Sequence, residues 1–100
     1  MLEELRAELD RIDETLLAVL RERLECCLRI GDYKRLHRVE MMQPHRISAV
    51  HERAASYGAA HGIDPGFLRQ LYDLIIAETC RLEELVIQNG GTDGHADTPH

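Results

Sequence analysis

Apolar residues recur every three or four positions from Leu2 to about His37, and this spacing predicts one long helix. No proline interrupts the segment, and Gly31 is its only helix-breaking residue. A helix of about 36 residues would be about 54 Å long, whereas a compact domain of 100 residues has a radius of gyration of about 13 Å. We therefore expect the helix to extend beyond its own domain. Its apolar face would then be buried against a second copy of the chain in an intertwined, two-fold homodimer.

Prolines and a glycine mark two further helices. Pro44 suits the first turn of a helix that runs to about His61, and Gln43 before it is expected to be extended. The inward positions of this second helix are Ile47, Val50, Ala54 and Tyr57. In "HGIDPGF", Gly62 ends the second helix, while Asp64 as the N-cap and Pro65 at the first position begin a third, which runs to about Gln88.

Composition agrees with an all-α protein of one domain. The chain has 44% apolar residues but only 4% aromatic residues and no tryptophan, which is typical of an aliphatic helical core. The final segment, "NGGTDGHADTPH", is rich in helix breakers and nearly lacks apolar residues. We expect a single helical domain over residues 1–89 and a disordered tail over residues 90–100.

Charge and cysteine content exclude several classes of function. A formal net charge of -6 disfavours a general nucleic-acid binder. Cys26, Cys27 and Cys80 have no metal-binding spacing, so we expect no metal site and three reduced thiols in the interior. No signal peptide and no run of about 20 apolar residues is visible, which indicates a cytoplasmic protein without membrane contact.

Polar residues interrupt the apolar face of two helices. The face of the first helix continues through positions 23, 27, 30 and 34, where Arg23 and Lys34 stand; on the third helix, Thr79 and Glu83 lie one turn apart. Long cations near an apolar face often extend their heads into water or form an interhelical ion pair. The alternative is a buried site in which one glutamate and two cations leave a positive excess for an anionic ligand. We expect Tyr57 and Tyr72 to serve in packing.

The order and spacing of three segments resemble the all-helical, three-helix chorismate mutases of the type II family. These segments are "LRAELDRIDETLLAVLRERLE", "IGDYK" and "LIIAETCRLE", and the resemblance covers about residues 4 to 88. It implies an intertwined dimer in which Arg6 crosses into the partner's site. It implies that Arg23 and Lys34 are the cations of the home site and that Arg46 lies at its rim. Thr79 then lies near the ring carboxylate, and Glu83 lies at the ether oxygen of the substrate.

The resemblance implies an isomerase that catalyses a Claisen rearrangement without a cofactor. Catalysis would rest on Lys34, Glu83 and Arg23, because the reaction requires a dicarboxylate held in its folded form and donors at the ether oxygen. Glu83 can donate a hydrogen bond only when it is protonated.

Two positions depart from the usual family pattern. The family has acidic residues where Gln43 and Ile47 stand here, and the second of these normally bonds the ring C4 hydroxyl. The run "MMQPHR" resembles the branch of the family that acts on 4-amino-4-deoxychorismate, a precursor of p-aminophenylalanine-derived antibiotics. Chorismate mutase, isochorismate pyruvate lyase and a non-catalytic helical dimer remain as alternatives.

Overall fold

The computed structural model describes residues 1–40 and 43–91 and contains three α-helices in this part of the chain. They are α1 (Leu2–His37), α2 (Pro44–His61) and α3 (Pro65–Gly91). The all-α class and the starts of all three helices agree with the prediction from the sequence. The third helix continues three residues beyond the expected end at Gln88, through Asn89 and Gly90. Most of the tail expected at residues 90–100 lies outside the described residues, as does the Met41–Met42 pair.

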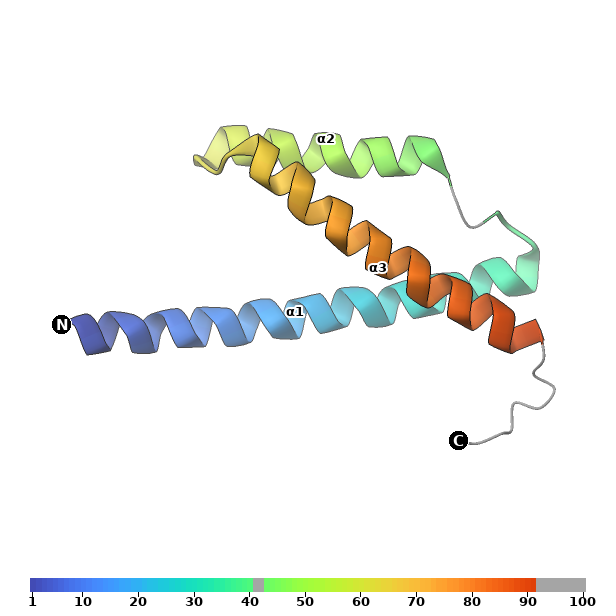
Figure 1. The fold of residues 1–100 in the computed structure, drawn as a ribbon, viewed down its shortest axis with the longest axis horizontal. Coiled ribbons are helices and arrows are strands. Elements are labelled where there is room, and N and C mark those ends of the chain that lie inside the picture. The colour runs from blue at the N-terminus through green and yellow to red at the C-terminus, as the bar shows by residue number, and fades with distance from the viewer. Residues whose placement is uncertain (41–42, 92–100) are drawn as a thin grey trace.

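The third helix is the central element of the fold. It crosses α1 near the C-terminal half of α1 and packs along α2, whereas the backbones of α1 and α2 do not come close to each other within the described residues (Figure 1). The N-terminal half of α1 projects away from the other two helices, so the chain measures 56 × 33 × 15 Å. The predicted overhang of the first helix is therefore present.

Local signals set the boundaries of the helices. Gly62 has a φ of 77°, a left-handed conformation that glycine adopts without steric cost, and it ends α2. The side chain of Asp64 accepts a hydrogen bond of 3.0 Å from the backbone N–H of Phe67, as an N-cap should. Gln43 is extended, with φ −129° and ψ 91°. These three features match the prediction. The left-handed conformation of Arg38 at the end of α1 was not predicted from the sequence.

The buried core is small and lies where α3 meets its two neighbours. Among the described residues, the buried apolar ones are Cys27, Val50, Ala54 and Ala55, and each of them is still 7% or 8% exposed. Tyr57 was expected on the inward face of α2, but it is 57% exposed and stacks on His61, while Gly58 faces inward instead. The reason is a close approach: a Cβ on Gly58 would lie 2.5 Å from the carbonyl oxygen of Ile63, so only glycine fits there. Cys26 is also exposed, contrary to the expectation that all three cysteines lie in the interior.

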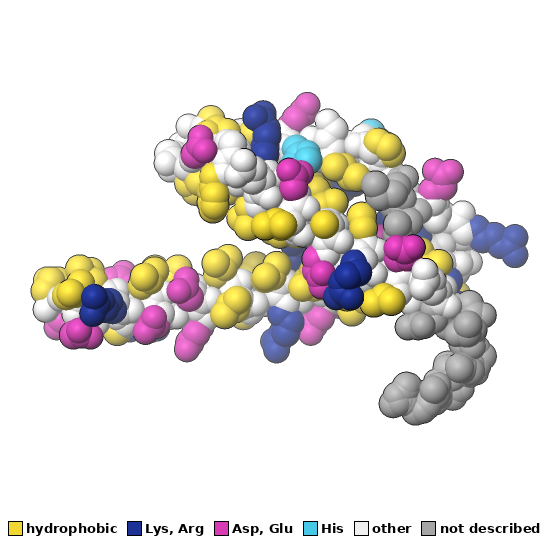
Figure 2. Space-filling view, in the orientation of Figure 1, with side chains coloured by type: hydrophobic (Ala, Val, Ile, Leu, Met, Phe, Trp, Pro, Cys, Tyr) yellow, Lys and Arg dark blue, Asp and Glu magenta, His cyan; other side chains and the backbone are white. Residues whose placement is uncertain are grey.

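A row of large apolar side chains is exposed along the projecting half of α1. Leu5, Leu9, Ile12 and Leu16 are each more than half exposed, and Figure 2 shows apolar atoms along this helix. Ordinary protein surfaces expose single, scattered apolar residues, whereas these residues form a row along one helix. Within the described residues, no helix combines the length and the apolar character needed to cross a membrane.

Candidate functional site

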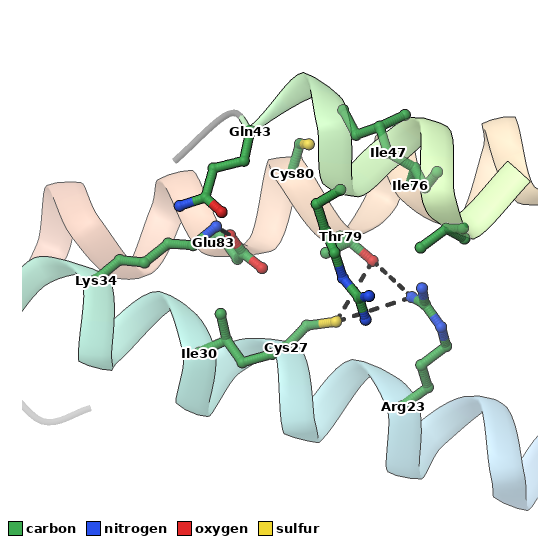
Figure 3. A pocket seen from close by; sticks show the side chains of 12 residues that line it. Arg23, Cys27, Ile30, Lys34, Gln43, Ile47, Ile76, Thr79, Cys80 and Glu83 are labelled. Carbon is green, nitrogen blue, oxygen red and sulfur yellow. Dashed lines mark hydrogen bonds and ion pairs between the residues drawn. The ribbon is translucent and has the colours of Figure 1, made fainter. Parts of the chain in front are cut away.

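All three helices contribute side chains to one pocket of about 260 Å³ (Figure 3). Its lining combines cationic, polar and apolar side chains: Arg23, Cys27, Ile30, Lys34, Gln43, Arg46, Ile47, Val50, Ile76, Thr79, Cys80 and Glu83. Seven of the eight residues predicted for the site are among them. The helical period brings them together, because Arg23 and Lys34 share one face of α1 and Thr79 and Glu83 share the facing side of α3.

Arg23 occupies one end of the pocket. Its Nη1 donates a hydrogen bond of 3.0 Å to the hydroxyl oxygen of Thr79 and lies 3.8 Å from the sulfur of Cys27. The sulfur of Cys27 is in turn 3.6 Å from the Thr79 oxygen, which closes a triangle of contacts visible in Figure 3. No carboxylate of the described residues forms an ion pair with Arg23, so its positive charge is left for a ligand to balance.

Lys34 and Glu83 occupy the other end. The Lys34 ammonium lies 3.0 Å from Oε1 of Glu83, and the two side chains are only 15% and 6% exposed. A pair this deeply buried is costly unless its geometry is good and its other polar atoms also have partners. The predicted convergence of cations with Thr79 and Glu83 is present, because Arg23 bonds to Thr79 and Lys34 pairs with Glu83.

The first turn of α2 forms the third wall. Gln43 caps the helix, and its backbone oxygen accepts a hydrogen bond of 2.8 Å from the N–H of Arg46. Pro44 fixes the start of this turn, so that Gln43, Arg46 and Ile47 all border the pocket. Ile47 presents an apolar surface where the family pattern has an acidic residue.

Arg6 does not belong to this pocket. It lies on the projecting part of α1, its side chain is 64% exposed, and its Nη1 is 3.3 Å from Glu3. Within one chain, Arg6 is therefore distant, along α1, from the site that Arg23 and Lys34 of the same chain form.

Five lining residues were not predicted as site residues: Cys27, Ile30, Val50, Ile76 and Cys80. Three of them had a sequence signal, since Cys27 and Ile30 lie between the two cations on the same face of α1 and Cys80 follows Thr79. Burial raises the pKa of the Cys80 thiol, and the Glu83 carboxylate adds to this effect while Lys34 opposes it. Cys80 is therefore a neutral thiol at neutral pH and adds no charge to the pocket.

Gly31 permits the close contact that holds this site together. A Cβ at this position would lie 3.2 Å from both Cα and Cγ of Glu83, so α1 and α3 touch at the residue that pairs with Lys34. We expect Gly31→Ala to destabilise the fold by about 1 kcal/mol, because the overpacking penalty exceeds the gain in helix propensity. Chemical denaturation measures this effect.

Gly66→Ala is the matched control for that substitution. Its Cβ would meet only the Asp64 side chain at 3.4 Å, an ordinary contact, so the stability of the fold should be unchanged or slightly higher. A Gly31→Ala protein as stable as Gly66→Ala would show that the contact with Glu83 is not tight.

The three helices and the pocket lined by cations define an all-helical protein with one candidate site formed by side chains of all three helices. The sequence model of the family described as chorismate mutase type II matches residues 5–84, and the chain therefore belongs to that family. Family membership confirms the predicted fold class and the predicted enzyme class, an isomerase.

Two relatives from streptomycetes share most of their length with this chain. A 4-amino-4-deoxychorismate mutase of Streptomyces pristinaespiralis is 64% identical over 90 residues, which are 90% of this chain and 70% of that protein. A 4-amino-4-deoxychorismate mutase of Streptomyces venezuelae is 55% identical over 86 residues, 86% of this chain and 84% of that protein. The bifunctional chorismate mutase/prephenate dehydratase of Escherichia coli is 31% identical over 84 residues, which are 22% of its length.

Proposed function

We propose that the protein rearranges 4-amino-4-deoxychorismate to 4-amino-4-deoxyprephenate, a step towards p-aminophenylalanine-derived antibiotics in shikimate-derived metabolism. The 64% identity to a relative with that name carries the proposal, since it extends over nine tenths of this chain. The apolar Ile47 in the wall of the pocket supports it, because a family member with the usual acidic residue would bond a C4 hydroxyl there.

The reaction moves electrons within one molecule. The ether C–O bond breaks as a C–C bond forms between the enolpyruvyl group and the ring, and no proton or electron is gained or lost overall. Arg23 grips one carboxylate through its flat, multidentate guanidinium, and Thr79 lies beside it. The partner subunit's Arg6 grips the second carboxylate. Together they hold the reactive, folded conformer and remove much of the entropic barrier.

Lys34 and Glu83 act at the ether oxygen, which gains negative charge as the C–O bond lengthens. Donors placed in advance at such an atom each contribute about 10² to 10³ in rate. The 3.0 Å contact between the two side chains places both heads at the same end of the pocket. Glu83 donates a hydrogen bond only in its protonated form.

Substitution tests the role of Glu83 as a hydrogen-bond donor. We expect Glu83→Gln to remain active, because its amide supplies the same hydrogen bond, and Glu83→Ala to lose about 10²-fold in kcat/KM. A Glu83→Ala protein as active as Glu83→Gln would contradict this role of Glu83.

Chorismate itself is the second candidate substrate. Gln43 borders the same pocket, and its amide offers both a donor and an acceptor, so it can bond a hydroxyl group as well as an amine. Isochorismate pyruvate lyase activity is a third possibility, and a non-catalytic dimer would show no turnover of any of these substrates.

Ranking the substrates by kcat/KM tests the proposal directly. We expect 4-amino-4-deoxychorismate to exceed chorismate by at least about 10-fold, and isochorismate to be inert; a tenfold preference corresponds to about 1.4 kcal/mol of differential transition-state binding. A blank without protein supplies the background rate of the uncatalysed reaction, and the Arg23→Ala protein, prepared identically, controls for contaminating activity. Equal or higher turnover of chorismate would assign the protein to ordinary chorismate mutase activity.

The proposal includes a homodimer in the cytoplasm. The exposed apolar row on the projecting half of α1 supports it, since burying that row against a second chain removes a large apolar area from water. Arg6 lies on this same half of the helix, so a partner wound along it brings Arg6 to the partner's pocket.

A further inference from the structure

Tyr72 contacts Arg23 without lining the pocket itself. It is a half-buried residue of α3, two helical turns before Thr79 on the same face of the helix. The guanidinium carbon of Arg23 lies over its ring, 5.5 Å from the ring centre. Tyr72 itself does not line the pocket in the part of the chain that the structure describes. Its ring thus contacts the arginine and does not face the pocket.

Arg23 and Lys34, two of the three cations that line the pocket, are held in different ways. Lys34 is paired with the carboxylate of Glu83, whereas Arg23 contacts a hydroxyl, a thiol and an aromatic ring, all of them neutral. A carboxylate at Arg23 would compete with the carboxylate of the substrate. An aromatic ring attracts the cation through its π face and uses none of the N–H groups of the guanidinium.

We propose that Tyr72 is a positioning residue, which holds the guanidinium plane of Arg23 ready to grip a substrate carboxylate. A bidentate interaction with a carboxylate depends on the orientation of the guanidinium plane, because two N–H groups must point to the two carboxylate oxygens at once. The bond to Thr79 fixes one nitrogen, and contact with the ring restricts rotation about that bond. The identity of the carboxylate in this inference rests on the proposed function. The contact between Arg23 and Tyr72 rests on the geometry alone.

Three single variants test the role of the ring. We expect Tyr72→Phe to retain wild-type kcat/KM within about twofold, because the π face remains, and Tyr72→Leu to lose about 10-fold. Phe67→Leu is the matched control, since it removes an aromatic ring from the same helix at an exposed position outside the pocket and should leave activity unchanged.

A double variant separates positioning from packing. If Tyr72 acts through Arg23, Arg23→Ala/Tyr72→Leu will be no less active than Arg23→Ala alone. If Tyr72 only stabilises the fold, the two losses will multiply, and the proposal is overturned.

A measurement without substrate keeps the test independent of the proposed function. In an NMR spectrum, the Nε–H signal of Arg23 can be assigned by its loss in Arg23→Lys, and we expect the Tyr72 ring to displace its chemical shift. In Tyr72→Leu this chemical shift should move towards that of an exposed arginine such as Arg21, whereas in Tyr72→Phe it should not. If the proposed substrate is wrong, the wild-type protein will turn over chorismate instead, but the Tyr72 ring will still displace the Arg23 resonance. A resonance that stays in place in Tyr72→Leu, together with wild-type activity, would overturn the role of Tyr72.

Discussion

Replacing Arg23 with alanine is expected to lower kcat/KM by at least about 10³-fold, which is a loss of about 4 kcal/mol of transition-state stabilisation. The reason is that Arg23 has no carboxylate partner among the described residues, so its charge and free N–H groups are directed to the substrate. The loss should appear without a change in helical content, because Arg23 is only partly buried. Steady-state kinetics and circular dichroism measure the two effects.

Arg21→Ala is the control for Arg23→Ala. Arg21 lies on the same helix two residues earlier, but its side chain is 75% exposed and it pairs with Glu25 at 3.8 Å. Exposed ion pairs of this kind contribute little, so activity should stay within about threefold of wild type. If Arg23→Ala also stayed within that range, the pocket would not be the active site.

Mixing two inactive variants is expected to restore activity. Arg6→Ala should be nearly inactive if the partner subunit's Arg6 completes each site. Equal amounts of Arg6→Ala and Arg23→Ala chains, unfolded and refolded together, should recover about a quarter of wild-type activity. Half of the dimers are then mixed, and each mixed dimer has one site with an intact Arg23 and an intact arginine from the other chain.

The parent proteins refolded separately are the control for the mixing experiment. Their summed activity sets the baseline, and size-exclusion chromatography establishes that both variants form dimers. Activity of the mixture no higher than this baseline would mean that Arg6 does not act across the interface, and would place its function within its own chain or outside catalysis.

The sequence predicts the helices closely because local chemistry sets their ends. Pro44, Gly62, Asp64 and Pro65 restrict the backbone or supply a capping bond regardless of what surrounds them, and each lies where it was expected. The period of the helix places Arg23 and Lys34 on one face of α1, and it places Thr79 and Glu83 on one face of α3. These parts of the fold are determined by residues that are close together in the sequence.

Features that depend on the angle between helices could not be predicted in this way. Tyr57 was expected inside, but the close approach of Gly58 to Ile63 turns the tyrosine outward. Tyr72 was assigned to packing, because a sequence does not show which cation an aromatic ring will face. Gly31 was recognised only as a helix breaker, although it admits the contact with Glu83 across two helices.

The separation between the backbones of α1 and α2 in the described residues has a consequence for how this enzyme family can diversify. The residues proposed to drive the bond rearrangement are carried by α1 and α3, whereas the wall that includes Gln43, Arg46 and Ile47 is formed by the N-cap and first turn of α2, whose backbone packs against α3. Mutations in the first turns of α2 can therefore alter which ring substituent is accepted while the reactive half of the site is inherited intact. Chimeras that exchange only this short segment between relatives offer a direct route to new substrate preferences.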